Sequence, residues 1–167
     1  TKNYIEFSSY EINSSENILM KNKIREVDEL GQYLKKGEFE NLFNLVGVLN
    51  QSDPKQRYLE NSEIIYKQRY RDTKKLDYLY NILISQILQK KVENALITVN
   101  RILNREETNG NTYLTKAIIN TYLIKPKEAQ EAINKAKIYN KSSESNQILN
   151  TLEGVIKIMN LKFESAY

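Results

Sequence analysis

The sequence predicts an all-α fold in which antiparallel helix pairs stack side by side in a short array. Apolar residues recur at helical spacing along most of the chain, and no alternating strand pattern appears. Only 5 glycines and 2 prolines interrupt 167 residues, which indicates few turns and long elements. The third observation is a 34-residue period, which is typical of stacked helical repeats. The recurring positions are Leu79, Ala95, Val99 and Ile102, followed by Tyr113, Ala129, Ile133 and Ala136.

The chain begins with a segment of different character, residues 1–13. Its apolar side chains do not follow helical spacing, so we expect an extended arm. Ser14 and Ser15 can then cap a first helix, because a serine hydroxyl accepts a hydrogen bond from an N–H of the first turn. Gly37 offers that helix a C-terminal stop, since glycine adopts the left-handed conformation of helix ends without strain. The apolar stripe of this helix consists of Ile24, Val27, Leu30 and Leu34.

The second and third predicted helices meet at Asp53 and Pro54. A helix from about Phe39 keeps one apolar face and ends there. Asp53 suits the N-cap of the next helix, and Pro54 suits its first turn, where a missing N–H costs no hydrogen bond. The helix over 54–71 is the irregular element of the array, because its apolar face is thin and its surface is strongly charged.

The second half of the chain continues the helical spacing between polar breaks. The stretch from Thr108 to Asn111 is the clearest loop, and a serine-rich break follows at 142–145. The predicted helices are 73–90 (capped by Asp72 or Thr73), 92–105, 112–124, 127–140 and 145–160, with the start of another at 163–167. The predicted domains are an arm at 1–13 and one helical-repeat domain at 14–167, with units at 15–53, an irregular 54–72, 73–107, 111–141 and a truncated 144–167.

The repeated unit places small residues where two helices of a pair would approach closely. Ala117 and Ala129 stand 12 residues apart in one unit, and Ser85 and Ala95 stand 10 apart in another. In these residues the chain resembles the tetratricopeptide repeat family, which has a small residue in its first helix, an alanine early in its second, and apolar residues four and seven positions later. The matching positions, with Leu42 in place of the alanine in the first unit, are Gly31, Leu42, Val46, Leu49, Pro54, Ala95, Val99, Ile102, Ala117, Ala129, Ile133, Ala136, Gly154 and Ala166.

The resemblance implies both an architecture and a function. The architecture is a right-handed solenoid. The function is that of a non-enzymatic interaction module, or scaffold, that holds a peptide or helix of a partner protein in a concave groove. In the family this groove is lined by residues of the first helix of each pair. On that analogy the candidate groove residues are Asn81, Gln86, Gln89, Lys90 and Thr121.

The composition argues against catalysis. The chain contains no histidine and no cysteine, which excludes disulfides, Cys/His zinc sites, a histidine base and a cysteine nucleophile. Acidic clusters at 26–29 and 106–107 lack the spacing of metal ligands or of paired catalytic carboxylates. We therefore expect no enzyme activity, no metal and no cofactor. An enzyme that relies on glutamate or lysine alone is the third alternative.

Basic and aromatic residues interleave between positions 66 and 80. Arginine forks bind carboxylates or phosphates and tyrosine rings offer contact surface, so one interpretation is a recognition patch. The other is structural, because cations stabilise helix C-termini and tyrosines fill the seams between helices. The patch carries the alternative function, an α-helical nucleic-acid-binding regulator. Its members are Tyr66, Lys67, Arg69, Tyr70, Arg71, Lys74, Lys75, Tyr78 and Tyr80, of which Tyr66, Arg69, Tyr70 and Tyr80 are candidate partner-binding residues.

The expected partner is another protein, and a homodimer is an open alternative. The formal net charge of +4 is mild for a nucleic-acid binder. No apolar run approaches the ~18 residues that a membrane span needs. Because the chain begins at Thr1 rather than Met, we expect a trimmed or processed form of a longer product. The lack of cysteine is compatible with a location in the cell envelope.

Overall fold

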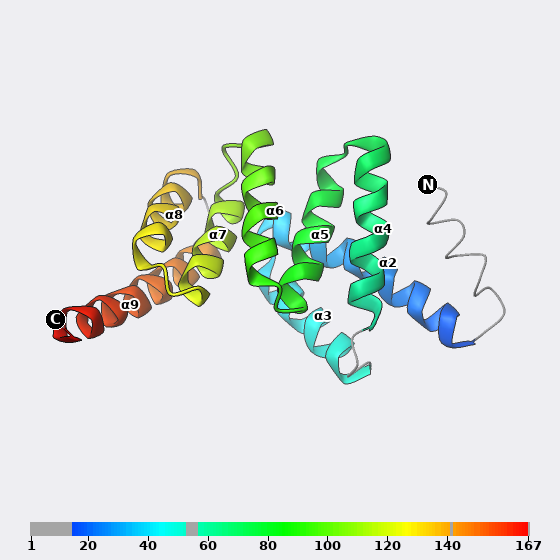
Figure 1. Ribbon diagram of the computed structural model, residues 1–167, viewed down its shortest axis with the longest axis horizontal. Helices are drawn as coiled ribbons and strands as arrows, with labels where there is room; N and C mark the ends of the chain where they lie inside the picture. Colours follow the sequence, from blue (N-terminus) through cyan, green and yellow to red (C-terminus); the bar gives the residue numbers. More distant parts are fainter. Residues whose placement is uncertain (1–14, 53–56, 141, 167) are drawn as a thin grey trace.

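The computed structural model describes residues 15–52, 57–140 and 142–166, and this part of the chain is built from helices without any strand (Figure 1). The all-α prediction is therefore confirmed. The arm predicted at 1–13 and the predicted helix start at Pro54 lie outside the described residues. The helices are α2 (Ser15–Lys36), α3 (Phe39–Ser52), α4 (Arg57–Thr73), α5 (Leu76–Leu88), α6 (Val92–Arg105), α7 (Gly110–Tyr122), α8 (Pro126–Tyr139) and α9 (Ser143–Ala166).

Helices α4 to α9 pack against one another in chain order. Each contacts the next, from α4 on α5 to α8 on α9, and α9 also packs on α7. Helix α2 departs from this order, because it crosses behind the upright helices and packs on α5, α4 and α7 (Figure 1). Helix α3 packs chiefly on α2. As a result α5 has α2, α4 and α6 around it and lies at the centre of the molecule.

The apolar stripes of the sequence lie in the seams between these helices. Leu30 of α2 and Leu83 of α5 are fully buried, and burying a side chain of this size contributes about 1.5–3 kcal/mol. The small residues of the repeat, Ala95, Ala117 and Ala129, are fully buried as well. Their methyl groups occupy little space, so the helix backbones on either side can approach closely.

Two consecutive helix pairs share one turn geometry. Lys90 after α5 and Ile124 after α7 adopt the left-handed backbone conformation, with φ of 62° and 58°. The N–H of Lys91 and that of Lys125 each donate to the carbonyl five residues earlier, at 2.9 Å in both turns. This is the closing hydrogen bond of a Schellman motif. The two turns stand one full sequence period apart, so the period of the sequence is also a period of the backbone.

Gly31 lies where α2 meets α5. A Cβ at this position would collide with Asn81 Oδ1 and would lie 3.3 Å from the Asn81 backbone nitrogen. Glycine therefore allows these two helices to approach more closely than any other residue would. In the predicted unit at 15–53, Gly31 belongs with Leu42 of α3. In the structure the Gly31 face of α2 instead packs against Asn81 of α5.

The start of α5 differs from the prediction. Helix α4 continues to Thr73, whose hydroxyl donates to the Arg69 carbonyl at 2.8 Å. Lys74, with φ of 56°, then ends the helix. Helix α5 begins only at Leu76, and its N-cap, Lys75, makes no side-chain capping bond. The predicted cap at Asp72 or Thr73 is wrong, because these residues still belong to α4.

The end of the chain also differs. A break was predicted between helices at 145–160 and 163–167, but α9 runs continuously from Ser143 to Ala166. Gly154 and Ala166 therefore lie on one helix and not on the two helices of a pair. Gly154 is exposed, and no atom lies within 4 Å of the position its Cβ would take. No residue between 160 and 163 is a glycine or proline, so nothing there interrupts the backbone hydrogen bonds.

Candidate binding groove

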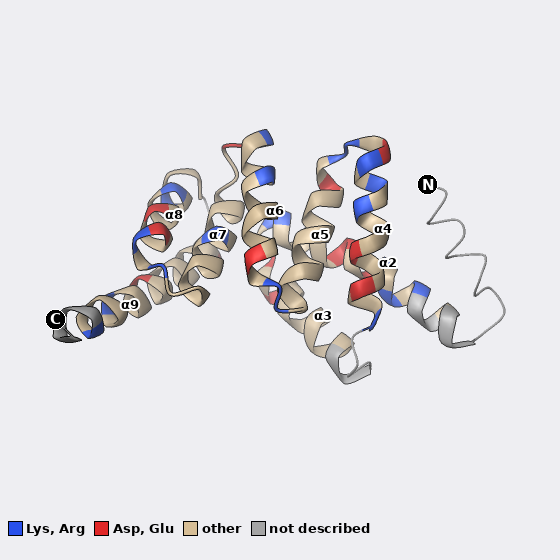
Figure 2. Ribbon diagram, viewed as in Figure 1, with Lys and Arg blue, Asp and Glu red and all other residues tan. Residues whose placement is uncertain are grey.

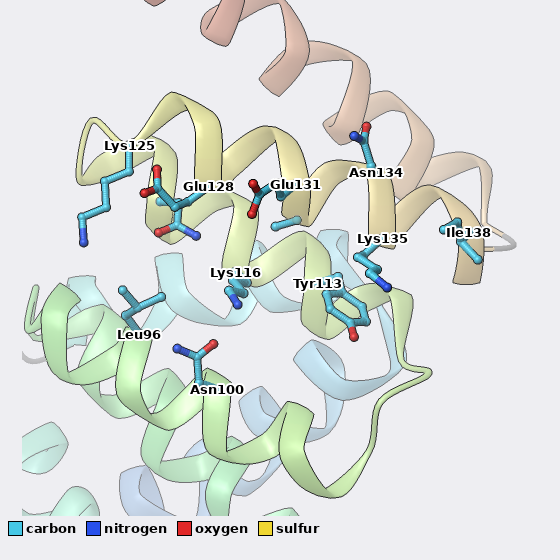
Figure 3. Close-up of a pocket in the computed structure, with 12 residues that line it drawn as sticks. Leu96, Asn100, Tyr113, Lys116, Lys125, Glu128, Glu131, Asn134, Lys135 and Ile138 are labelled. Carbon is cyan, nitrogen blue, oxygen red and sulfur yellow. The ribbon is translucent and has the colours of Figure 1, made fainter.

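A groove of about 610 Å³ runs between α6 and α8, with α7 between them (Figure 3). In Figure 3 Leu96 and Asn100 of α6 lie opposite the side chains of α8, and Lys116 and Tyr113 of α7 lie between the two. Apolar, amide and charged groups are mixed along it, which is typical of a surface that recognises a peptide. The lining residues are Leu96, Asn100, Tyr113, Lys116, Asn120, Lys125, Glu128, Glu131, Ala132, Asn134, Lys135 and Ile138.

Asn120 contributes an unpaired hydrogen-bond donor to this groove. Its side chain is 1 % exposed, and its Nδ2 has no hydrogen-bond partner. A buried polar group without a partner costs about 1–3 kcal/mol of stability. Its backbone carbonyl, in contrast, closes the α7–α8 turn by accepting from Lys125 at 2.9 Å. The backbone of Asn120 is thus fixed while its amide nitrogen is left without an acceptor.

The equivalent position one repeat earlier is Gln86, and its amide is fully used. Gln86 Nε2 donates to Glu63 Oε2 at 3.1 Å, and Thr98 Oγ1 donates to Gln86 Oε1 at 2.6 Å. Lys91 Nζ contacts the other oxygen of Glu63 at 3.1 Å. The space between α4 and α6 is therefore filled by a carboxylate together with its amide and ammonium donors.

Glu63 stays ionised in this buried place. Burial alone raises its pKa, but hydrogen bonds outweigh that effect and lower the pKa from 4.5 to about 2. Each bond favours the charged form, because an ionised carboxylate only accepts. The donors are Lys67, Gln86, Lys91 and Gln89.

The groove keeps the donors of this cluster but has no carboxylate at the position equivalent to Glu63; its own acidic residues, Glu128 and Glu131, lie on α8. Asn120 stands one period after Gln86, and Lys125 stands one period after Lys91. Both line the groove. The position one period after Glu63 is Ile97, whose side chain is 63 % exposed and fills no seam. The groove thus occupies the place that corresponds, one repeat later, to the space filled by the Glu63 cluster. The residue equivalent to Glu63 does not enter it.

A change of side-chain size opens the space as well. Ala132 lies one period after Thr98 and also lines the groove. Its methyl group replaces the hydroxyl that fills the earlier seam by bonding Gln86. Two shorter side chains at equivalent positions, Asn120 for Gln86 and Ala132 for Thr98, leave room that the first pair does not have.

Four of the predicted partner-binding residues are buried and present no surface to a partner. Tyr66 donates through its hydroxyl to the Ile24 carbonyl at 3.1 Å. Asn81 donates to Asp28 at 3.0 Å, and Gln86 belongs to the Glu63 cluster. The burial of Tyr66, Tyr80, Asn81 and Gln86 argues against a contact role for them. Helix α2 packs on Tyr66 and Asn81, whereas Glu63 of α4 and Thr98 of α6 cover Gln86.

Tyr80 belongs to a buried cluster that ties the α6–α7 loop to α5. Its hydroxyl lies 2.7 Å from Thr112 Oγ1, donates to Glu106 at 3.1 Å, and accepts from Asn109 at 3.1 Å. Burial, together with the Glu106 carboxylate, raises the pKa of Tyr80 far above its usual value. The phenol is therefore a structural hydrogen-bond donor.

The other predicted contact residues are at least partly accessible but do not line the groove. Arg69 and Tyr70 lie on α4, and Gln89 and Lys90 lie in the α5–α6 turn. Thr121 is half-buried and donates to the Ala117 carbonyl at 2.8 Å. The groove residues that sequence reasoning missed are Asn120, Lys125 and their neighbours. Comparing polar residues across the 34-residue period, as was done for apolar ones, would have paired Gln86 with Asn120.

The described residues contain no group of three or more acidic, histidine or cysteine side chains placed to hold a metal ion. Among the described helices, none has both the length and the apolar character needed to cross a membrane. Comparisons with models of protein families, with curated proteins and with solved structures found no match. What the groove binds is therefore inferred from its own geometry.

Proposed function

We propose that this chain is a non-enzymatic binding module that holds an acidic segment of a partner protein in the α6–α8 groove. The observation that carries the proposal is the unpaired, buried Nδ2 of Asn120 in a groove that also contains Lys125. A carboxylate from the partner would pair with Lys125, and a turn of the buried Asn120 amide towards the groove would let its Nδ2 donate to the same carboxylate. In this way it would restore the cluster that Glu63 completes one repeat earlier.

The dimensions of the groove suit a short extended segment. Its lining on the α8 side extends from Lys125 to Ile138, which corresponds to ~20 Å at 1.5 Å per residue. An extended chain rises about 3.3 Å per residue, so roughly six residues of a partner would fit. Leu96 and Ile138 would contact its apolar side chains, and the carboxylate near Asn120 would fix its register.

The shared turn supports a short tetratricopeptide-like arrangement of α5–α6 and α7–α8. Both pairs have a left-handed residue, a closing bond of the same length and a buried alanine at equivalent positions. In such arrays, concave surfaces between units are used for binding. We propose that α2 and α3 modify this arrangement at one end by covering the inner face of α5.

The proposal is tested by selection followed by a matched pair of substitutions. A random peptide library of about six variable residues, long enough to span the groove, is selected on the wild-type chain. The selected peptides, with blocked termini, are then measured by isothermal titration calorimetry. We expect glutamate or aspartate to be enriched at one position. We also expect Asn120→Leu to weaken binding roughly 10- to 100-fold, since a hydrogen bond to a charged group contributes about 1.5–3 kcal/mol.

The same substitution at the equivalent position is the control. Gln86→Leu removes a donor from buried Glu63 and should lower the melting temperature while leaving the groove residues in place. Asn120→Leu removes an unpaired group and should leave the melting temperature unchanged or raise it. Unchanged peptide affinity in Asn120→Leu, or selected peptides without an acidic residue, would contradict the proposal.

A further inference from the structure

Three cationic side chains surround the ring of Tyr70 near the C-terminal ends of α4 and α6. The guanidinium carbons of Arg101 and Arg105 lie 5.2 and 6.0 Å from the ring centroid, and Lys74 Nζ lies 5.3 Å from it. Arg105 also donates to the Lys74 carbonyl at 2.7 Å. Two helices that are separated in the sequence thus bring their charges together around one aromatic ring.

These cations belong to a larger basic surface at one edge of the molecule. Figure 2 shows the blue segments gathered at the upper ends of α4 and α6. Six cationic residues lie here, and the acidic Asp72, Glu106 and Glu107 stand beside them in the sequence, so the local net charge is +3. We call this the Tyr70 basic surface; it consists of Arg69, Arg71, Lys74, Lys75, Arg101 and Arg105.

The charge around the ring is largely uncompensated. Within the described residues, no carboxylate forms an ion pair with Lys74, Arg101 or Arg105. The nearby Asp77 pairs instead with Lys35 of α2, at 2.9 Å. The helix C-termini contribute negative charge, but only about half a unit each. Three like charges held within 6.0 Å of one centroid therefore repel one another unless an anion binds between them.

Two of the basic positions are followed by another cation one period later. Arg105 stands one period after Arg71, and Lys135 stands one period after Arg101. These cations therefore stand at equivalent positions of alternate helices, on α4 and α6 in one case and on α6 and α8 in the other. A polymer with anions at regular intervals fits such a row better than a compact anion would.

We propose that the Tyr70 basic surface binds the phosphate backbone of a nucleic acid. Cations already cover the Tyr70 ring, so bases have little room to stack on it. The guanidinium groups of Arg101 and Arg105 rest on the ring and keep N–H donors for phosphate oxygens. A single exposed ion pair contributes little, so a useful affinity requires many of them and the release of counterions from a polymer. Binding is therefore independent of base sequence.

The test is fluorescence anisotropy with a labelled DNA duplex of about 20 base pairs, titrated with the full chain between ~50 and ~200 mM salt. We expect binding at low salt that falls steeply as salt rises. The variant Arg101→Gln/Arg105→Gln should lower the slope of log K against log salt by roughly 1.8, because each phosphate contact contributes about 0.9. A second duplex of unrelated sequence should bind equally well.

The matched control is Lys127→Gln/Lys157→Gln, which removes the same charge from exposed positions of α8 and α9. It should keep the wild-type slope, and circular dichroism should show that both double variants stay folded. Three results would overturn the proposal: no binding at the lowest salt, an equal loss in both double variants, or polyglutamate binding as tightly as DNA. The last result would identify an acidic protein as the partner of this surface.

Discussion

Glu63 is a buried carboxylate whose charge contributes to stability at neutral pH. Its pKa is lowered from 4.5 to about 2 in the folded chain. A depressed pKa means that the folded state binds its proton less readily than the unfolded state does. The stabilisation is therefore complete above pH 4.5, decreases as the pH falls below that value, and is lost once the pH passes about 2. A shift of this size corresponds to about 3 kcal/mol.

We predict that Glu63→Gln flattens the acid limb of the stability profile. The neutral side chain cannot pair with Lys67 and Lys91, so the variant should be less stable than wild type at pH 7. The variant has no carboxyl group to titrate at this position. The difference in the free energy of unfolding between wild type and variant should therefore shrink as the pH falls from 4.5 towards 2. Urea unfolding at several pH values measures both effects. A difference that stays constant over this range would refute the assignment.

The groove becomes recognisable only when each of its residues is compared with the equivalent residue one repeat earlier. Taken alone, Asn120 would be interpreted as a polar surface residue of a helix, and Ala132 as an ordinary core residue. Their meaning depends on Gln86 and Thr98, which fill the same places one repeat earlier. The period was visible in the sequence, but which polar residues face a seam depends on helix rotation, and that is set by packing against α2 and α6.

At the scale of elements, three turns are closed without glycine, whereas Gly37, with φ of 76°, closes the turn after α2. Lys74, Lys90 and Ile124 all adopt the left-handed conformation in which glycine is usually found. Isoleucine is the most strained of the three, because its branched Cβ crowds the backbone at positive φ. Glycine positions therefore do not locate these turns. For this reason the helix boundaries predicted near residues 73 and 124 differ by a few residues from those of the structure.

We predict that the same substitution has opposite effects at two exposed isoleucines. Ile124→Gly should stabilise the chain by roughly 1 kcal/mol, because it relieves the left-handed strain. Ile97→Gly lies within α6, where glycine is a poorer helix former than isoleucine, and should destabilise the chain by roughly 0.5 kcal/mol. Both residues are more than 60 % exposed, so core packing contributes little to either effect. Thermal melts of the two variants give the signs, and two changes of equal sign would contradict the turn geometry.

At the scale of the molecule, the crossing of α2 over α5 is the feature that sequence reasoning did not anticipate. The helices themselves were largely predictable, because their apolar stripes follow the helical period. The helix against which each stripe packs was not predictable. Gly31, for example, indicates that another helix approaches closely, but the sequence does not show which helix this is. The family analogy predicts that α3 packs against Gly31, whereas in the structure Asn81 of α5 does so.

We predict opposite effects of Gly→Ala at two helical glycines. Gly31→Ala should destabilise the chain by about 1–3 kcal/mol, because the added methyl collides with Asn81 and overpacks the contact. Gly154→Ala, in the open part of α9, should stabilise by about 0.5–1 kcal/mol through helix propensity alone. Urea unfolding measures both values. If Gly31→Ala were as stabilising as Gly154→Ala, α2 and α5 would not be in contact.

The path of α2 also has a consequence for how the chain folds and unfolds. The Lys35 carbonyl at the end of α2 accepts hydrogen bonds from Asn109 at 3.2 Å and Asn111 at 3.4 Å, across 74 and 76 residues of chain. Arrays whose units touch only their neighbours can lose units one at a time from either end. Here α2 contacts α7 directly, so we expect that the chain between them must close on itself before this contact can form. We expect folding to be correspondingly slow, and we expect the segment from α2 to α7 to melt in a single transition.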